Sequence, residues 1–517
     1  MSRQEKFSAE IQAGYQFAGQ SIVLGGAMLD GAPIQGLQVK VPLRTLNRHG
    51  LIAGATGTGK TKSLQVIAEQ LSAHGIPSLL MDIKGDLSGL AMPGSDHPKI
   101  QERCKAIGID WRAHGTPVEF LTLSNEKGVR LRATVSEFGP VLFSRILGLN
   151  DTQGGIVSVV FKYCDDHNLP LLDLKDFKKT LQYLGNEGKA QIEAEYGQFS
   201  AASAGTILRK VIELEQQGAE LFFGELSFDV RDLCRVDEQG RGIASIVRLT
   251  DIQDRPKLFS TFMLQMLAEI YATFPERGDS DRPELCIFID EAHLVFQEAT
   301  SALLQQLETI IKLIRSKGIG VYFITQNPDD IPASILAQLG LKLQHALRAF
   351  TARDRKAIKT AAENYPLTTW YKTDELLTHL GTGEAIVSVL SEKGIPTPLA
   401  HTLMRAPEGR MDVLSADEID QFIGRSTLVR KYNQAIDRES AYEILTEKIK
   451  EAQNAAPPAA PRTTPRAAPA RKEKTVIETV MDSSVTRQVG RTLARELTRG
   501  LLGVLGLGGS SSTRRRR

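Results

Sequence analysis

The chain has 517 residues, which is too long for one ordinary hydrophobic core and predicts two or more structural units. Hydrophobic residues make up 42% and charged residues 24%, and no apolar run reaches the roughly 18 to 20 residues of a membrane helix, so an integral membrane segment is excluded. The net charge of +2 is uneven: residues 451–517 hold 13 Lys+Arg and 5 Asp+Glu, a balance of +8, which leaves −6 for residues 1–450. Contact with nucleic acid would therefore depend on local patches or on the C-terminal region.

The N-terminal stretch MSRQEKFSAEIQAGYQF has neither the apolar core nor the cleavage pattern of a signal peptide. The four cysteines are far apart and form no CxxC pair, which argues against a disulfide framework and against a zinc site. Both observations favour a cytoplasmic protein. We interpret residues 1–49 as a short N-terminal β segment because of the strand-like runs SIVLGGAML and LQVKVPL.

From about Gly50 the pattern alternates between strand, loop and helix, which is typical of an α/β fold with a mainly parallel sheet. GLIAG predicts a buried strand, Lys60 to Ser72 a helix, and SLLMDIKG the next strand. Further strands are expected at VEFLTL, GIASIVRL, LCIFID, GVYFITQ, LQHALRA and EAIVSVL. The expected organisation is a first part of the core at 50–124, a helical insertion at 125–235, a second part of the core at 236–405, a C-terminal helical segment at 406–453, an Ala/Pro-rich linker at 454–473, and a basic helix with a disordered end at 474–517.

A glycine-rich loop follows the run GLIAG. It fits G-x-x-x-x-G-K-[ST] at every fixed position, through Gly54, Ala55, Thr56, Gly57, Thr58, Gly59, Lys60 and Thr61. Glycines let the backbone turn so that N–H groups point at phosphate oxygens, and the helix that follows adds its positive N-terminal end. We expect the loop to bind ATP or GTP, with Lys60 at the β and γ phosphates and the Thr61 hydroxyl on Mg²⁺. The alternative is a chance match in a glycine-rich turn, which the flanking strand and helix disfavour.

The run LCIFIDEAH places an acidic pair at the end of a buried strand. We expect Asp290 to bind on the Mg²⁺ side and Glu291 to orient and deprotonate the attacking water. A strand end that merely caps the next helix is the alternative. The letters DEAH also suggest the DEAH-box RNA helicases, but the Ser-Ala-Thr and Gln-x-x-Gly-Arg-x-Gly-Arg motifs of those enzymes are missing from the sequence, so His293 has no expected role.

The segment LLQQLETIIKLIRSKGIGVYFITQNPDDIP predicts a helix, a turn, a strand and a polar tip. The strand delivers Gln326, whose amide can hydrogen-bond both a γ-phosphate and a lytic water. Arg315 stands at the helix end, far in sequence from the glycine-rich loop, and suits insertion into the site of a neighbouring subunit. A solvated cation favoured by the helix dipole is the other interpretation of Arg315.

Five motifs, NRHGLIAGATGTGKT, DIKGDL, IFIDEAH, IRSKGIGVYFITQNP and LGTGEAIVSV, together resemble the HerA/FtsK branch of P-loop ATPases, and most closely a HerA-like bacterial family. The resemblance runs from about Pro42 to Ala400 and continues through DRESAYEIL. It implies a RecA-like P-loop NTPase fold, ATP and Mg²⁺ as cofactors, Arg315 as an arginine finger acting in trans, and Gln326 as the polar sensor. It also implies that Arg348, in HALRAFTARD, contacts nucleotide, and that the DIKGDL loop lies near the nucleotide, where Asp86 either assists Mg²⁺ or water or only caps a turn.

The resemblance further implies a homo-oligomer, a hexameric ring that moves double-stranded DNA through its channel. The sequence departs from the family pattern in one respect, because only about 50 residues precede the loop and a full N-terminal β-barrel is not expected. The four arginines Arg487, Arg491, Arg495 and Arg499 recur at every fourth residue and would form one basic stripe on a helix at 474–502, which suits phosphate contact, an anionic membrane surface, or a solubilising tail.

Two function classes remain open from the sequence: an ATP-driven motor on double-stranded DNA, and an ATP-dependent switch or scaffold that acts on a protein partner without translocation. The arginine finger and the sensor glutamine favour the motor, whereas the acidic body and the missing barrel favour the switch. A metabolic kinase is disfavoured because the sequence carries no substrate-side signature.

Overall fold

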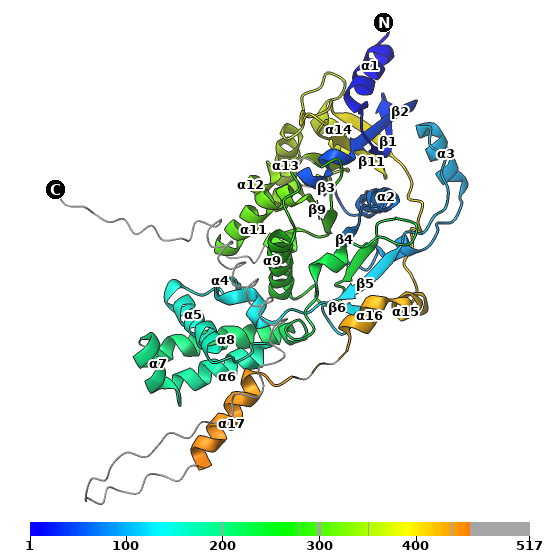
Figure 1. The fold of residues 1–517 in the computed structure, drawn as a ribbon. Helices are drawn as coiled ribbons and strands as arrows, with labels where there is room; N and C mark the ends of the chain where they lie inside the picture. The colour runs from blue at the N-terminus through cyan, green and yellow to red at the C-terminus, as the bar shows by residue number, and fades with distance from the viewer. Residues whose placement is uncertain are drawn as a thin grey trace, which may run out of the picture. The chain divides into compact units, whose positions relative to one another are not determined.

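The computed structural model describes residues 1–197, 200–278, 280–296, 301–349, 351–434, 436 and 438–454, so the linker and basic helix predicted beyond Asn454 lie outside the described residues (Figure 1). The chain divides into two compact units. Unit 1 comprises Met1–Arg132, Gln217–Phe222 and Leu226–Ala435, and unit 2 comprises Ala133–Gln216, Phe223–Glu225 and the residues from Ile436 onward.

Unit 1 is built on one sheet of 12 strands with the order β2-β1-β12-β11-β10-β3-β9-β8-β4-β7-β5-β6. Neighbouring strands from β10 to β6 run parallel, and those from β2 to β10 run antiparallel. The predicted α/β fold with a mainly parallel sheet is thereby confirmed. The strands are β1 (Ser21–Leu29), β2 (Ala32–Pro42), β3 (Gly50–Ala53), β4 (Ser78–Asp82), β5 (Val118–Thr122), β6 (Val129–Arg130), β7 (Ala244–Arg248), β8 (Leu285–Ile289), β9 (Ile319–Thr325), β10 (Leu341–Gln344), β11 (Glu384–Ser388) and β12 (Ala400–Met404).

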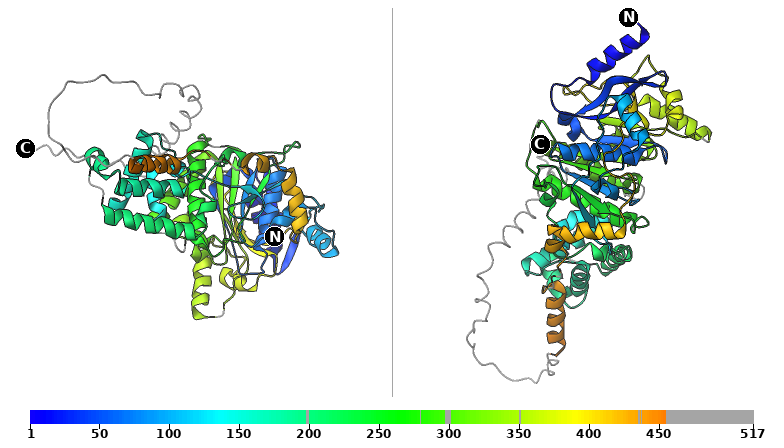
Figure 2. Two further views of the ribbon diagram at one scale, coloured as in Figure 1. Left: turned by 90° about the horizontal axis from the view of Figure 1, so that it is seen from below. Right: turned by 90° about the vertical axis from the view of Figure 1, so that its right-hand side faces the viewer.

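Helices cover this sheet, and Figure 2 shows unit 1 from two further sides. The helices of unit 1 are α1 (Arg3–Tyr15), α2 (Lys60–Ala73), α3 (Pro98–Ile107), α9 (Pro256–Thr273), α10 (His293–Phe296), α11 (Ser301–Ile314), α12 (Ala333–Leu336), α13 (Ala352–Glu363), α14 (Thr373–His379), α15 (Ala416–Arg425) and α16 (Thr427–Tyr432). Among the described residues, no helix combines the length and the apolar composition that crossing a bilayer requires.

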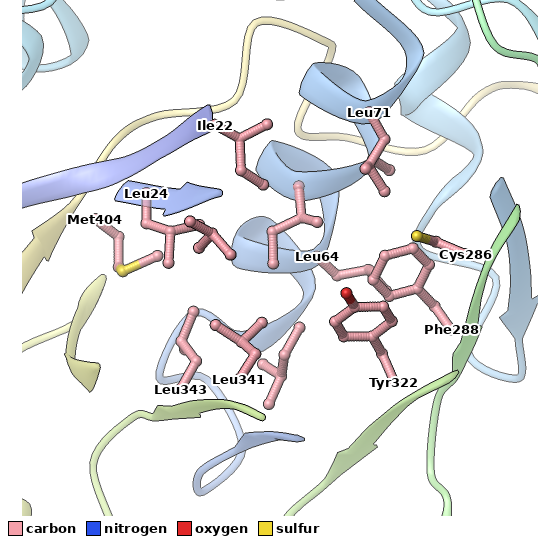
Figure 3. Close-up of a cluster of buried hydrophobic side chains, with 14 of the residues drawn as sticks. Ile22, Leu24, Leu64, Leu71, Cys286, Phe288, Tyr322, Leu341, Leu343 and Met404 are labelled. Atoms are coloured by element: carbon pink, nitrogen blue, oxygen red, sulfur yellow. The ribbon is translucent and has the colours of Figure 1, made fainter. Parts of the chain in front are cut away.

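The parallel strands beneath α2 are almost entirely apolar because they are buried. A parallel strand is buried on both faces, so it lacks the polar alternation of a half-exposed strand. Leu64 and Leu71 of α2 point at the sheet, where Phe288 and Tyr322 stack with ring centroids 4.7 Å apart (Figure 3). The Tyr322 hydroxyl donates to the Leu46 carbonyl at 2.6 Å, which satisfies its one polar atom in the core.

The N-terminal segment begins with a helix that the sequence analysis did not single out. Ser2 and Glu5 form a capping box at the start of α1, and Phe7, Ile11 and Tyr15 recur at four-residue spacing and are buried. The Tyr15 hydroxyl lies 2.8 Å from the Pro398 carbonyl. The helix therefore packs into the core of unit 1, ahead of β1 and β2.

Unit 2 is helical and consists of α4 (Val135–Ile146), α5 (Asp151–Asp166), α6 (Leu174–Gly185), α7 (Lys189–Tyr196), α8 (Ala201–Gln216) and α17 (Ala441–Asn454). The phenyl rings of Phe143 and Phe177 meet edge to face at 4.8 Å in its core. Asp176, which is buried, accepts the backbone N–H of Tyr442 at 2.9 Å and so ties the start of α17 to α6. The sequence predicted a helical insertion in the α/β domain, and the helices of unit 2 form this insertion.

A segment that follows β12 crosses the outer face of α2, the helix that begins at the glycine-rich loop. Glu69, on α2, accepts the N–H groups of Glu408 at 2.9 Å and Gly409 at 2.7 Å. One turn earlier, the Gln65 amide donates to the Arg410 carbonyl at 3.1 Å. Burial raises the pKa of Glu69 to about 7, against the lowering effect of the two N–H groups.

This buried carboxyl group predicts a pH-dependent stability. Because the folded chain holds the Glu69 proton more tightly than the unfolded chain, the contribution of Glu69 is greatest at low pH and is lost as pH rises from the ordinary glutamate pKa toward about 7. Between about pH 5 and about pH 8, wild type should lose about 2 to 3 kcal/mol of unfolding free energy relative to Glu69→Gln. Urea unfolding of both proteins at the two pH values measures this difference.

The control is Glu363→Gln on the exposed side of α13, which makes the same chemical change without removing a buried carboxyl group. If the gap between wild type and Glu69→Gln were the same at both pH values, Glu69 would not be the titrating group.

Candidate nucleotide-binding site

The glycine-rich loop links the end of β3 to the start of α2, at the carboxyl edge of the parallel strands. Gly59 caps α2 with φ of 115°, a backbone conformation that other residues rarely adopt. At Gly54, with φ of 152°, an added Cβ would lie 2.6 Å from Cβ of His345. Glycine is therefore required at both positions, by conformation at Gly59 and by close approach at Gly54.

Lys60 points back into its own loop. Its ammonium donates to the carbonyls of Gly54 at 2.6 Å and Ala55 at 3.1 Å, and only 6% of the residue is exposed. Burial and the nearby Lys84 ammonium lower the pKa of Lys60. A buried cation among neutral carbonyls is poorly compensated, so an anionic group in the loop would stabilise its charged form.

Residues that flank two strands, one just after β10 and one just before β11, hydrogen-bond to the loop. The N–H of Ala55 donates to the Ala346 carbonyl at 2.8 Å, and the N–H of Gly383 donates to the Thr58 carbonyl at 3.0 Å. The His345 ring lies 2.9 Å from the hydroxyl of Ser63, in the first turn of α2. Burial lowers the pKa of His345 to about 4, so its ring is neutral near neutral pH. These contacts fix the loop and leave the Lys60 ammonium and the Thr61 hydroxyl, the side-chain groups expected to act on phosphate and Mg²⁺, out of the supporting bonds.

Asp290 and Glu291 follow β8 directly, at the same edge of the sheet. Burial raises the pKa of Asp290 to about 6, and the nearby Lys84 opposes that effect. Glu291 has φ of 44°, a left-handed conformation that costs energy in a residue with a side chain. Burial alone would raise the pKa of Glu291, but Lys84, His293 and Gln326 together outweigh burial and the pKa is lowered.

Gln326 follows the last residue of β9 and lies between the glycine-rich loop and the acidic pair Asp290–Glu291. Its Nε2 is 3.4 Å from both carboxylate oxygens of Glu291, and its Oε1 accepts the Thr56 hydroxyl at 3.4 Å. Because β9 lies between β3 and β8 in the sheet, its end brings the amide between the glycine-rich loop and the acidic pair.

The end of β4 and the loop after it contribute three charged residues, those of the motif DIKGDL, to which the sequence assigned no definite role. Asp82 accepts the backbone N–H groups of Gly85, Asp86 and Leu87 at 2.8, 3.1 and 3.2 Å. Lys84 forms an ion pair with Glu291. Asp86 accepts the Thr61 hydroxyl at 3.0 Å. The only sequence signal was the charged motif DIKGDL after a strand, and the partners of Lys84 and Asp86 lie too far along the chain to be found from it.

The donor set at this edge fits a magnesium ion. Mg²⁺ prefers carboxylate, hydroxyl and water oxygens, and Thr61, Asp86 and Asp290 supply such atoms. The second carboxylate oxygen of Asp86 is buried and has no hydrogen-bond partner. A cation bound nearby would satisfy that oxygen and would favour the charged form of Asp290.

The two arginines expected to act on nucleotide lie at opposite edges of the sheet. Arg348 is exposed in the loop after β10, two residues beyond Ala346, which contacts the glycine-rich loop. Arg315 is exposed in the 3-10 turn Arg315–Lys317 before β9, so it precedes the strand whose far end carries Gln326.

A second observation places Arg315 at the amino edge. Burial and, in addition, the charge of Arg315 lower the pKa of His49, the residue that immediately precedes β3. The seven residues of β9 span roughly 23 Å at about 3.3 Å per residue. Arg315 is therefore not gathered with the other candidate residues of its own chain.

The "DNA double-strand break repair helicase HerA" of Sulfolobus acidocaldarius is 19% identical over 360 residues, and that of Sulfurisphaera tokodaii is 22% identical over 361 residues. Each alignment covers 68% of this chain and 64% of the relative, so the chain spans less than two thirds of these relatives.

The bacterial conjugative coupling protein TrwB, in its unbound monoclinic form, has a similar fold, with a TM-score of 0.51 and 14% identity. The match covers 79% of this chain and 94% of that one. The family model "Helicase HerA-like C-terminal" matches residues 28–512, which is nearly the whole sequence. This chain belongs to the helicase HerA-like C-terminal family.

Proposed function

We propose that the protein is a Mg²⁺-dependent ATP hydrolase that works as a homo-oligomer, a hexameric ring, on double-stranded DNA. One observation carries the hydrolase part: Lys60 and Thr61, the acidic pair Asp290–Glu291, and Gln326 come from three adjacent strand ends and meet at one edge of the sheet. These groups belong to motifs that are far apart in the sequence, and only the order of the strands in the sheet brings them together. Their convergence is what hydrolysis of a nucleoside triphosphate requires.

Each residue has a defined task in this reaction. The loop N–H groups and Lys60 bind the phosphates, and Thr61 and Asp290 hold Mg²⁺, which neutralises charge on the phosphate oxygens when it is bound. Glu291 accepts the proton of the attacking water. Gln326, already between Thr56 and Glu291, orients that water against the terminal phosphate. Arg348, at the same edge, contacts the nucleotide.

Assembly is supported by the position of Arg315. An exposed arginine at the amino edge cannot reach its own loop but is accessible to another copy of the chain. Action on double-stranded DNA is supported by the names of the curated relatives, which are DNA double-strand break repair helicases. The basic stripe predicted at 474–502 would add phosphate contacts.

Duplex DNA is expected to raise the steady-state ATPase rate severalfold, and the stimulation should fall as salt rises, because phosphate contacts release counterions. The measurement is a coupled ATPase assay with and without a linear duplex, over a series of salt concentrations. Lys60→Ala is the negative control, because it removes the phosphate-binding ammonium and should show no turnover with or without DNA.

A switch that acts on a protein partner is the second candidate, and the net charge of −6 on residues 1–450 favours it, because an acidic surface repels DNA. ATP hydrolysis that no duplex length stimulates at low salt would contradict the motor and support the switch.

A further inference from the structure

The ion pair between Lys84 and Glu291 has no part in the hydrolysis described above. Glu291 is expected to accept a proton from water, yet its carboxylate is held by the Lys84 ammonium and lies 3.2 Å from the Nδ1 atom of His293. A carboxylate that is bound to a cation is a weaker base than a free one. The base is therefore restrained in the nucleotide-free chain.

Lys84 itself lies among the groups expected to surround a terminal phosphate. Its charge acts on Lys60, on Asp290 and on Asp86 as well as on Glu291. The loop therefore brings a second ammonium group to the candidate phosphate site, beside the lysine of the glycine-rich loop. A terminal phosphate carries more negative charge than one carboxylate and would compete with Glu291 for this ammonium.

The Lys84 side chain is free to make such an exchange, whereas its backbone is not. Asp82 holds the three N–H groups that follow Lys84, and the Gln253 amide donates to the carbonyl of Ile83, the residue before it, at 2.7 Å. By contrast, 37% of the Lys84 side chain is exposed, against 7% for Glu291. Movement would be confined to a long flexible side chain on a fixed loop.

We propose that Lys84 is a second phosphate-binding lysine: it holds Glu291 in the nucleotide-free chain and transfers to the terminal phosphate of a bound nucleoside triphosphate. The inference rests on the proposed function and adds to it a way of coupling the base to its substrate. Glu291 is released only when a third phosphate is present, so a nucleoside diphosphate leaves the ion pair intact.

Binding without turnover tests this exchange. Dissociation constants for ADP and for a non-hydrolysable β,γ-imido analogue of ATP are measured with Mg²⁺, by displacement of a fluorescent ADP. Lys84→Met should weaken analogue binding about tenfold or more, the size expected for one hydrogen bond between charged groups, and leave ADP within about twofold. Lys84→Arg keeps the charge and should recover part of the loss.

A second variant separates exchange from a structural role. Glu291→Gln removes the carboxylate that competes for Lys84, so it should strengthen analogue binding, and this gain should vanish when Lys84→Met is added. The matched control is Lys372→Met, which removes a lysine from an exposed ion pair with Glu375 and should change neither constant.

Equal weakening of both nucleotides by Lys84→Met, or no change in either, would overturn the inference and leave the proposed hydrolase standing. Wild type that binds neither nucleotide would overturn both.

Discussion

Arg315→Ala is expected to reduce ATP turnover by about 10³-fold to 10⁵-fold, the range found for arginines that stabilise the transition state of phosphoryl transfer. Nucleotide affinity should stay within about twofold of wild type. The reason is that β9, roughly 23 Å long, separates Arg315 from the edge of the sheet that carries the phosphate loop of the same chain. Steady-state rates and fluorescent-nucleotide binding measure the two effects separately. A loss of rate with affinity retained is the result that a residue acting on another copy of the chain would give.

Mixing tests whether Arg315 acts in trans. Lys60→Ala has an intact Arg315 but no phosphate-binding lysine, and Arg315→Ala has an intact Lys60 but no arginine. In a mixed assembly, a site between two different variants can therefore combine Lys60 from one chain with Arg315 from the other. Partial recovery of activity is expected on mixing. Lys312→Ala, which removes an exposed cation from the same helix end, is the control and should keep the wild-type rate. An Arg315→Ala protein that hydrolyses ATP normally would remove the case for a shared site.

Glu291→Gln is expected to reduce turnover by about 10²-fold to 10⁴-fold, because the amide cannot accept the proton of the attacking water. The substitution keeps the size of the side chain, and with it the fit beside Gln326. Single-turnover hydrolysis isolates the chemical step from product release. Bound ATP should remain uncleaved, with no loss in the amount bound.

His293→Ala tests whether the histidine of the DEAH motif takes part in the chemistry expected of Asp290 and Glu291. His293 lies 3.2 Å from the Glu291 carboxylate, and losing one such contact should lower the rate less than about tenfold, in line with about 1 kcal/mol for a hydrogen bond. A loss as large as that of Glu291→Gln would show that His293 takes part in the chemistry.

The features that sequence alone predicts well depend on neighbouring residues. The loop from Gly54 to Thr61 is recognisable because its geometry is set by closely spaced glycines, and the buried strands are recognisable because both faces are apolar. β12 was not predicted from the sequence, because polar residues interrupt its apolar run. It contains His401, which pairs with Glu384 at 3.0 Å, and the buried Thr402.

What escaped prediction depends on residues that only the fold brings together. Lys84 was visible as a charged residue after a strand, but its partner Glu291 is more than 200 residues away, just beyond the end of β8, which is next to β4 only in the sheet. The partner of His345, Ser63, was hidden in the same way. A single sequence holds no signal for such pairings, because strand order is set by long-range packing.

The sheet order has a consequence for how copies of this chain can associate. Its outermost strands are β2, against which α1 and α3 pack, and β6, which is only two residues long. Among the described residues, β6 is too short to offer a long row of backbone donors and acceptors for strand addition, and two helices pack against β2. In the assembly proposed above, contacts between copies would therefore be made by side chains rather than by strand addition, and such contacts can re-form without breaking the sheet.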